Sequence, residues 1–242
     1  MNNYRNGKII CNLEKSATPI ESKVATDEFT DKLNLHFDFN FDGVNKVYPY
    51  ILPEIVNTLD YNILCITGPS GSGKSTLIKQ LVFNSKLKEY DSSKAIISNF
   101  ESYEDAENRL CSVGLASVPT WCKPRNVLSI GEGARADLAL NINNNVVFDE
   151  FTSTIDRNTA IAMSNSIQKY IYKNDIKHVV FVSAHNDYID FIKPSLVIDL
   201  ETECLYDCRN INLSLDKSTT YHYNNEIGTF TIWFIQNYMY AE

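Results

Sequence analysis

Short apolar runs alternate with helix-length segments through the middle of the chain. Uninterrupted apolar residues predict strands over 63–66, 95–97, 146–148 and 179–182. Helices are predicted between them over 75–83 and 129–140, and at the helical spacing of Ala160, Met163, Ile167 and Tyr170. Fully apolar strands that alternate with helices are typical of a mainly parallel sheet with helices on both faces. The pattern therefore predicts an α/β fold.

Other patterns add elements nearer the two ends. Apolar and polar residues alternate over 33–41, which predicts a half-buried strand that ends at Asp42 and Gly43. Residues 203–206 and 211–215 are predicted as edge strands. A C-terminal helix with one aromatic face, packed on the core, is predicted from the spacing of Phe230, Trp233, Phe234 and Tyr238.

The composition narrows the class of protein. The 242 residues include 22 Lys plus Arg and 30 Asp plus Glu, which gives a formal net charge of −8. That charge disfavours whole-surface electrostatic binding to nucleic acid or to an anionic membrane. The hydrophobic fraction of 44% and the charged fraction of 21% are ordinary for a globular protein. A largely disordered chain and a disulfide-stapled mini-protein are therefore excluded.

The cysteines and the N-terminus carry no targeting or metal signal. The six cysteines have no CxxC spacing and no histidine pair at zinc-finger spacing, which favours reduced thiols. No apolar core follows the first basic residues, and no window approaches about 18 apolar residues. We therefore expect a cytoplasmic protein without a secretory signal or a direct membrane insertion.

A glycine-rich segment joins the 63–66 strand to the helix predicted after it. It reads Gly68-Pro69-Ser70-Gly71-Ser72-Gly73-Lys74-Ser75, followed by Thr76, and matches the P-loop pattern GxxxxGKS. Glycines let the backbone amides wrap around phosphate oxygens at a helix N-terminus. Lys74 is expected to reach the β- and γ-phosphates, Ser75 to ligate Mg²⁺ and Thr76 to touch the α-phosphate. The segment predicts an ATP-type nucleotide and magnesium as ligands.

Two carboxylates follow the apolar strand 146–148. Asp149 is placed to coordinate Mg²⁺, and Glu150 to polarise a water molecule. Taken alone this pair is a weak signal, because strands that end at solvent often finish in acids.

The segments around these carboxylates identify a family. Leu128-Ser129-Ile130-Gly131-Glu132 precedes them, Phe151-Thr152-Ser153-Thr154-Ile155-Asp156 follows them, and the strand 179–182 leads to His185. In order and spacing the chain resembles the ATP-binding cassette (ABC) ATPases, whose signature reads LSGGQ and whose Walker B strand continues as DEPTSxLD. The resemblance covers roughly residues 60–190. In its more detailed sequence the chain is similar to soluble stand-alone ABC ATPases of bacteria and phages.

The resemblance implies a homodimer in which two ATP molecules lie head to tail. Gly73, Lys74 and Ser75 of one copy would hold the phosphates, and Ser129, Gly131 and Glu132 of the other would cap the γ-phosphate. By the same resemblance Glu150 would be the general base, His185 would hydrogen-bond the γ-phosphate and Asp156 would cross the interface. Family members stack adenine on an aromatic residue before the P-loop, and Tyr48, 26 residues before Lys74, is the candidate.

The resemblance also implies one domain over 1–242. Its parts are an N-terminal β portion (1–60), a P-loop core (61–84 and 146–200), a short helical subdomain with the signature (85–145) and a C-terminal β and helix extension (201–242).

Two departures from the family pattern keep alternatives open. No glutamine lies between Val82 and Asn126, where transporter ATPases carry one, and Asn99 or Glu101 is the candidate substitute. Ile130 replaces a signature glycine.

The leading hypothesis is a soluble ATPase that opens and closes on a macromolecular partner, and nucleic acid as partner is neither predicted nor excluded. The alternatives are a nucleotide-binding subunit of an ABC membrane transporter and a non-hydrolysing, ATP-dependent dimerisation module.

Overall fold

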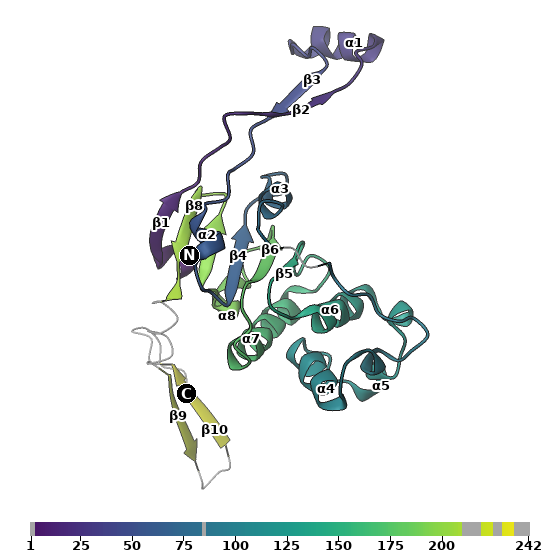
Figure 1. The fold of residues 1–242 in the computed structure, drawn as a ribbon, viewed down its shortest axis with the longest axis vertical. Coiled ribbons are helices and arrows are strands. Elements are labelled where there is room, and N and C mark those ends of the chain that lie inside the picture. Colours follow the sequence, from purple (N-terminus) through teal and green to yellow (C-terminus); the bar gives the residue numbers. More distant parts are fainter. Residues whose placement is uncertain (1–2, 84–85, 210–218, 225–228, 235–242) are drawn as a thin grey trace.

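The computed structural model describes residues 3–83, 86–209, 219–224 and 229–234. Its centre is a six-stranded sheet in the order β1-β8-β7-β4-β6-β5 (Figure 1). Four parallel strands form most of it: β7 (Leu196–Asp199), β4 (Ile63–Thr67), β6 (Val179–Ser183) and β5 (Val146–Phe148). An antiparallel edge follows, made of β8 (Cys204–Asp207) and β1 (Lys8–Asn12), next to the 3-10 turn η1 (Asn3–Asn6). The mainly parallel α/β sheet with an antiparallel edge is confirmed.

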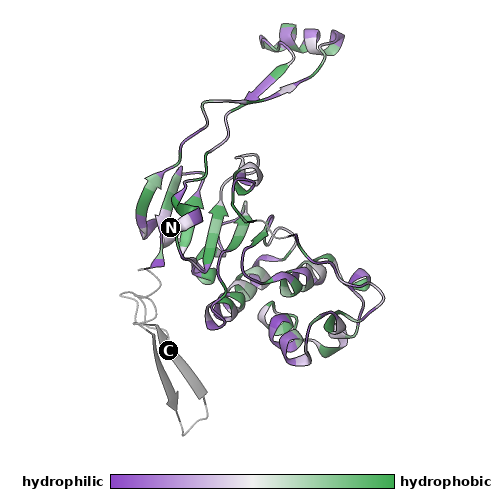
Figure 2. Cartoon of the chain, in the orientation of Figure 1, coloured by the Kyte–Doolittle hydropathy of each residue, from purple (hydrophilic) through white to green (hydrophobic). Residues whose placement is uncertain are grey.

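Alternate residues of the parallel strands build a core on each face of the sheet. Ile63 and Cys65 join one cluster, whereas Leu64 and Ile66 join the other. The first cluster is covered by α4 (Tyr103–Ser112), α6 (Ile130–Asn141), α7 (Arg157–Lys173) and α8 (Ile189–Ile192). The second is covered by the short helices α2 (Ile55–Thr58) and α3 (Lys74–Ile78). Both faces are buried, which explains why these strands read as continuous apolar runs (Figure 2).

A mainly helical segment, residues 96–141, lies at the end of the molecule away from β1 (Figure 1). It contains η2 (Ile96–Asn99), α4, α5 (Val118–Trp121), η3 (Arg125–Val127) and α6. The predicted strand at 95–97 is wrong, because this segment forms the 3-10 turn η2. Ile96 is fully buried, but its N–H donates to the carbonyl of Lys123 in a loop and not to a sheet ladder. The helix predicted over 75–83 is the shorter α3.

Residues 20–47 form an arm that projects from the body (Figure 1). Strands β2 (Ile20–Lys23) and β3 (Val44–Val47) pair as a two-stranded antiparallel sheet, and α1 (Glu28–Phe37) lies at the tip. Because β1 runs parallel to β4, the chain leaves for the arm from the sheet edge where the P-loop also begins.

The predicted strand over 33–41 is therefore wrong in this arm. Local contacts favour the helix: the Asp27 side chain accepts the N–H of Thr30, and the Thr30 hydroxyl accepts the N–H of Asp27. A helix satisfies its own backbone groups, whereas a strand at the tip would need a neighbouring strand. No side chain of α1 is buried, and Leu35 and Phe37 are 83% and 78% exposed.

The C-terminal helix predicted from Phe230, Trp233 and Phe234 is also wrong. These residues lie in β10 (Thr229–Phe234), which pairs antiparallel with β9 (Thr219–Asn224). Both segments are rich in Thr and aromatic residues, which favour strands. Tyr238 and the strand predicted over 211–215 lie outside the described residues.

Two further features concern the described residues alone. All six cysteines fall within them and are free thiols. Among the same residues, no helix is both long and apolar enough to cross a bilayer.

Candidate nucleotide site

The glycine-rich segment forms an open loop between β4 and α3, which we call the phosphate loop (residues 68–76). Gly71 and Gly73 adopt left-handed φ angles of 77° and 96°, which side chains disfavour. Apart from each glycine and its chain neighbours, no heavy atom of the described residues lies within 4 Å of the position that a Cβ would take there. Within the described residues the buried Ser72 hydroxyl has no hydrogen-bond partner. The open cradle at Gly71 and Gly73 fits a phosphate group.

Lys74 folds back on this loop. Its Nζ donates to the carbonyl oxygens of Gly68 at 2.8 Å and Pro69 at 2.7 Å. Burial lowers the pKa of Lys74 below its ordinary value, and the charge of Asp149 opposes that shift. The ammonium group is thus held over the phosphate loop by main-chain oxygens alone, which a phosphate would outcompete as a charged acceptor.

Ser75 follows β4 and Asp149 follows β5, and the two side chains meet although β6 lies between these strands in the sheet. The Ser75 hydroxyl donates to Oδ2 of Asp149 at 2.8 Å, and the N–H of Glu150 donates to Oδ1 at 2.9 Å. A hydroxyl and a carboxylate oxygen at the end of a phosphate loop fit the donor set that Mg²⁺ prefers. Glu150 has a left-handed φ of 55°, a strained conformation of the kind that clusters at functional sites.

We call residues 149–156 the carboxylate loop and residues 184–187 the switch loop. Together with the phosphate loop they line one cavity of about 450 Å³. Its lining consists of Ser70, Gly71, Gly73, Lys74, Ser75, Thr76, Asp149, Glu150, Ser153, Ser183, Ala184 and His185. The strands β4, β6 and β5 lie side by side in the sheet. The structure thus gathers residues that lie at or just after the carboxyl ends of these three strands.

Ser153 and Ser183 belong to this lining, although sequence analysis did not single them out. Ser183 is the last residue of β6, and its hydroxyl accepts the N–H of His185 at 3.1 Å. Ser153 is part of the loop that follows β5. The signal that would have found both is a polar residue at or just after the carboxyl end of a parallel strand.

Other predicted site residues do not line the cavity. Gly68, Pro69 and Ser72 belong to the phosphate loop itself, whereas Tyr48, Ser129, Gly131, Glu132 and Asp156 lie elsewhere. Tyr48 is 51% exposed. Its neighbour Tyr50 is engaged, because its hydroxyl donates to Glu203 at 2.5 Å. The cavity of one copy therefore contains only part of the nucleotide-binding residues that the sequence predicts.

Ser129, Gly131 and Glu132 form the signature turn (residues 129–132) at the start of α6. Ser129 Oγ accepts the N–H of Glu132 at 3.3 Å, and the Glu132 carboxylate accepts the N–H of Ser129 at 3.0 Å. This second bond is the main cause of the lowered pKa of Glu132. A Cβ on Gly131 would lie 3.3 Å from the carbonyl oxygen of Thr154, so the signature turn packs closely on the carboxylate loop. Ile130 is 76% exposed.

Asp156 caps the N-terminus of α7, where its side chain accepts the N–H of Thr159 at 2.9 Å. Asn99 is occupied locally: it accepts the N–H of Asp91 at 2.7 Å and donates to the carbonyl of Ala95 at 2.9 Å. Neither Asn99 nor Glu101 lines the nucleotide cavity.

Comparison with known proteins gives a likeness of fold. No model of a known protein family matches the chain, and no curated protein matches it. Among solved structures, the chain is similar to the dimeric, post-hydrolysis state of the ATP-binding cassette MJ0796 bound to ADP and Pi, with 15% identity and a TM-score of 0.47. That alignment covers 81% of this chain and 99% of the other.

Two further solved structures show the same likeness. A putative metal-chelate type ABC transporter in an inward-facing conformation has 16% identity and a TM-score of 0.46, over 82% of this chain and 94% of the other. The archaeal ribosome recycling factor aABCE1, in complex with the ribosomal stalk protein aP1, has 13% identity and a TM-score of 0.48, over 93% of this chain and 46% of the other. At identities of 13–16%, these are likenesses of fold alone.

Proposed function

We propose that the chain is an ABC-type ATPase in which two copies bind Mg-ATP between them and transfer its γ-phosphoryl group to water. One observation carries this proposal: Lys74, Ser75, Asp149, Glu150 and His185 line a single cavity. They come from three separate sequence motifs, and each has the chemistry that its motif requires. A glycine-rich loop without these partners would support only phosphate binding.

The roles follow from the chemistry of each side chain. Lys74 and the phosphate-loop amides would neutralise the charge of the β- and γ-phosphates of ATP. Ser75 and Asp149 would hold Mg²⁺, which supplies further charge neutralisation on those phosphates when bound. His185 would donate a hydrogen bond to a γ-phosphate oxygen.

Glu150 would accept the proton of the attacking water as its oxygen bonds to the γ-phosphorus. The bond between that phosphorus and the β–γ bridging oxygen breaks, and ADP leaves with the electron pair. Electrostatic preorganisation around the phosphates supplies most of the acceleration in such sites.

The second copy is proposed because the signature turn and Asp156 lie outside the cavity of their own copy. In a head-to-tail pair the N-terminus of α6 would face the γ-phosphate of the other copy, where its dipole favours negative charge. Tyr48 would then stack on adenine. Hydrolysis would remove the shared contact, and the resulting opening and closing would act on a macromolecular partner.

The test is phosphate release from Mg-ATP by the purified full chain and by its Lys74→Ala variant. We expect steady turnover that requires Mg²⁺ in the parent and none in the variant, because phosphate binding loses its cation. The control is Lys177→Gln, which breaks an ion pair with Asp60 on the surface. Absence of turnover at saturating Mg-ATP, with ATP-dependent dimers present, would instead support the dimerisation module. Co-purification with an integral membrane protein would support the transporter subunit.

A further inference from the structure

One arginine contacts both loops that carry the proposed water-activating and γ-phosphate groups. Arg157 donates from Nε to Oδ2 of Asp187 at 2.9 Å and from Nη2 to Oδ1 of the same carboxylate. Its remaining Nη1 donates to the hydroxyl of Thr152 at 3.3 Å. Asp187 belongs to the switch loop with His185, and Thr152 belongs to the carboxylate loop with Glu150. All three guanidinium nitrogens are therefore engaged by these two loops.

Arg157 also follows directly after Asp156, the residue proposed to face the second copy. It is the first residue of α7, and no acidic residue lies in the first turn of this helix. A cation at a helix N-terminus opposes the helix dipole. The arginine thus occupies a position that local helix stability disfavours, and the contacts to the two loops offset that cost.

The ion pair is too exposed to act mainly through stability. The side chains of Arg157 and Asp187 are 36% and 44% exposed. Exposed ion pairs typically add little to folding stability, because solvent and salt screen them. The bidentate geometry instead fixes the relative position of two loops, which a planar guanidinium does better than a lysine.

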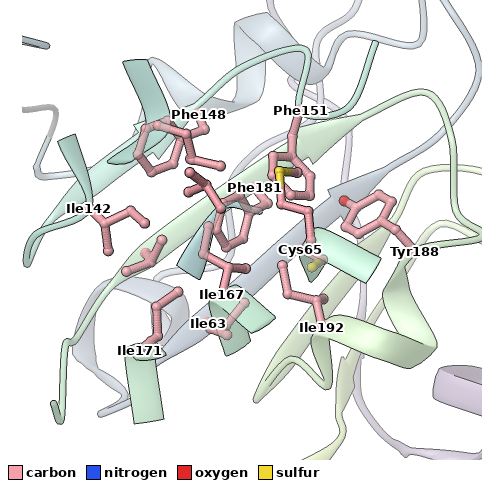
Figure 3. Packing of buried hydrophobic residues seen from close by; sticks show 14 of the residues in the cluster. Ile63, Cys65, Ile142, Phe148, Phe151, Ile167, Ile171, Phe181, Tyr188 and Ile192 are labelled. Atoms are coloured by element: carbon pink, nitrogen blue, oxygen red, sulfur yellow. The ribbon is translucent and has the colours of Figure 1, made fainter. Parts of the chain in front are cut away.

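The packing beneath the ion pair connects the same two loops. Phe151 of the carboxylate loop packs against Tyr188, which follows Asp187, with ring centroids 5.0 Å apart (Figure 3). The N–H of Phe151 donates to the carbonyl of Val182 in β6 at 2.7 Å. Thr152 is buried and has a left-handed φ of 68°, so its conformation needs support from its surroundings.

We propose that Arg157 is a positioning residue that holds the carboxylate loop, the switch loop and the Asp156 turn as one unit. Contact by the second copy at Asp156 would then position Glu150 and His185 at the same time. This inference rests on the proposed ATPase function for its catalytic consequence. The linkage between the loops is a property of the single chain without nucleotide.

The experiment compares the parent chain with Arg157→Gln, Asp187→Asn and the double variant. In the protein without nucleotide, hydrogen exchange of peptides that cover 149–157 and 183–190 is expected to accelerate in each single variant, in both segments at once. The turnover rate kcat is expected to fall about 10-fold or more, because small displacements of reacting groups are costly. The KM for ATP is expected to stay within about 3-fold, because neither residue lines the cavity.

The double variant should be no worse than either single variant, because both changes remove the same contact. Arg157→Lys should give an intermediate kcat, because lysine keeps the positive charge and loses the bidentate hydrogen bonding of the guanidinium. Lys177→Gln, at an ion pair remote from the cavity, should change neither exchange in these segments nor kcat.

Each outcome bears on one proposal at a time. Unchanged exchange in both segments overturns the linkage, whether or not the parent hydrolyses ATP. Faster exchange with kcat equal to the parent's overturns the catalytic consequence. A parent that does not hydrolyse ATP contradicts the proposed function, while the exchange measurement still decides the linkage.

Discussion

Ser75 Oγ lies 2.8 Å from Asp149 Oδ2, although 74 positions separate the two residues in the chain. The contact joins the phosphate loop to the carboxylate loop through a hydroxyl and a carboxylate, the oxygen ligands that Mg²⁺ takes in phosphoryl-transfer sites. The metal-dependent behaviour of the protein should therefore depend on this pair.

Asp149→Asn should raise the Mg²⁺ concentration needed for half-maximal ATP turnover by about 10-fold or more, because one anionic oxygen near the metal is lost. The measurement is phosphate release against Mg²⁺ at saturating ATP. Asp60→Asn, at an exposed carboxylate that pairs with Lys177, is the matched control and should leave the curve in place. An unchanged magnesium requirement in Asp149→Asn would contradict the assigned role.

As the pH rises, the affinity for ATP should fall at a lower pH than it would if Lys74 had the pKa of an ordinary lysine. Burial lowers the pKa of Lys74 below its ordinary value, so the ammonium loses its proton at a lower pH than a free lysine does. The affinity for ATP is then at its maximum below the lowered pKa of Lys74 and falls as the pH rises through that pKa. Titration with a fluorescent ATP analogue checks this, with circular dichroism showing that the fold persists. Affinity that stays constant up to pH 10.5 would refute it.

Gly131→Val should weaken ATP-dependent association of two copies while nucleotide binding by one copy persists. A Cβ at this position would already lie 3.3 Å from the Thr154 carbonyl, so a branched side chain must displace the signature turn. Sedimentation velocity with ATP and Mg²⁺ measures the association. Val127→Ala, at a residue that is 58% exposed, serves as the control. Equal association by the parent and Gly131→Val would argue against the signature turn as part of the interface.

Two leucines in helices should differ sharply in their contribution to stability. Leu110 in α4 is fully buried, so Leu110→Ala should lower the free energy of unfolding by about 2–5 kcal/mol. Leu35 in α1 is 83% exposed, and Leu35→Ala should change it by less than about 0.5 kcal/mol. Urea denaturation of the two variants and the parent compares them directly. A cost at Leu35 as large as that at Leu110 would mean that α1 is covered in solution.

The parallel core could be read from sequence because its determinants are local. Strands such as 179–182 are buried on both faces and so appear as apolar runs, and the phosphate loop has a motif that is tied to its geometry. The motifs assigned Ser75 and Asp149 to Mg²⁺ separately, and their contact arises because parallel strands bring their carboxyl ends to one edge.

The failures have a common physical cause. Alternation over 33–41 indicated a strand, but in this arm β2 and β3 pair with each other, and the capping pair Asp27 and Thr30 favours a helix at the tip. The helical spacing of Phe230 and Trp233 was equally compatible with two strands that pair, as β9 and β10 do. The contacts of Arg157 with two separate loops depend on tertiary placement, and no spacing in the sequence encodes them.

The central claim is that two copies share the γ-phosphate of ATP. It is tested most directly by the mass of the Glu150→Gln variant in solution, measured by light scattering with Mg-ATP and with Mg-ADP. This variant keeps the phosphate loop and loses the proposed base, so bound ATP should persist. We predict twice the mass of the single chain with Mg-ATP and the mass of one chain with Mg-ADP. A single-chain mass at saturating Mg-ATP, with the nucleotide demonstrably bound, would contradict the account.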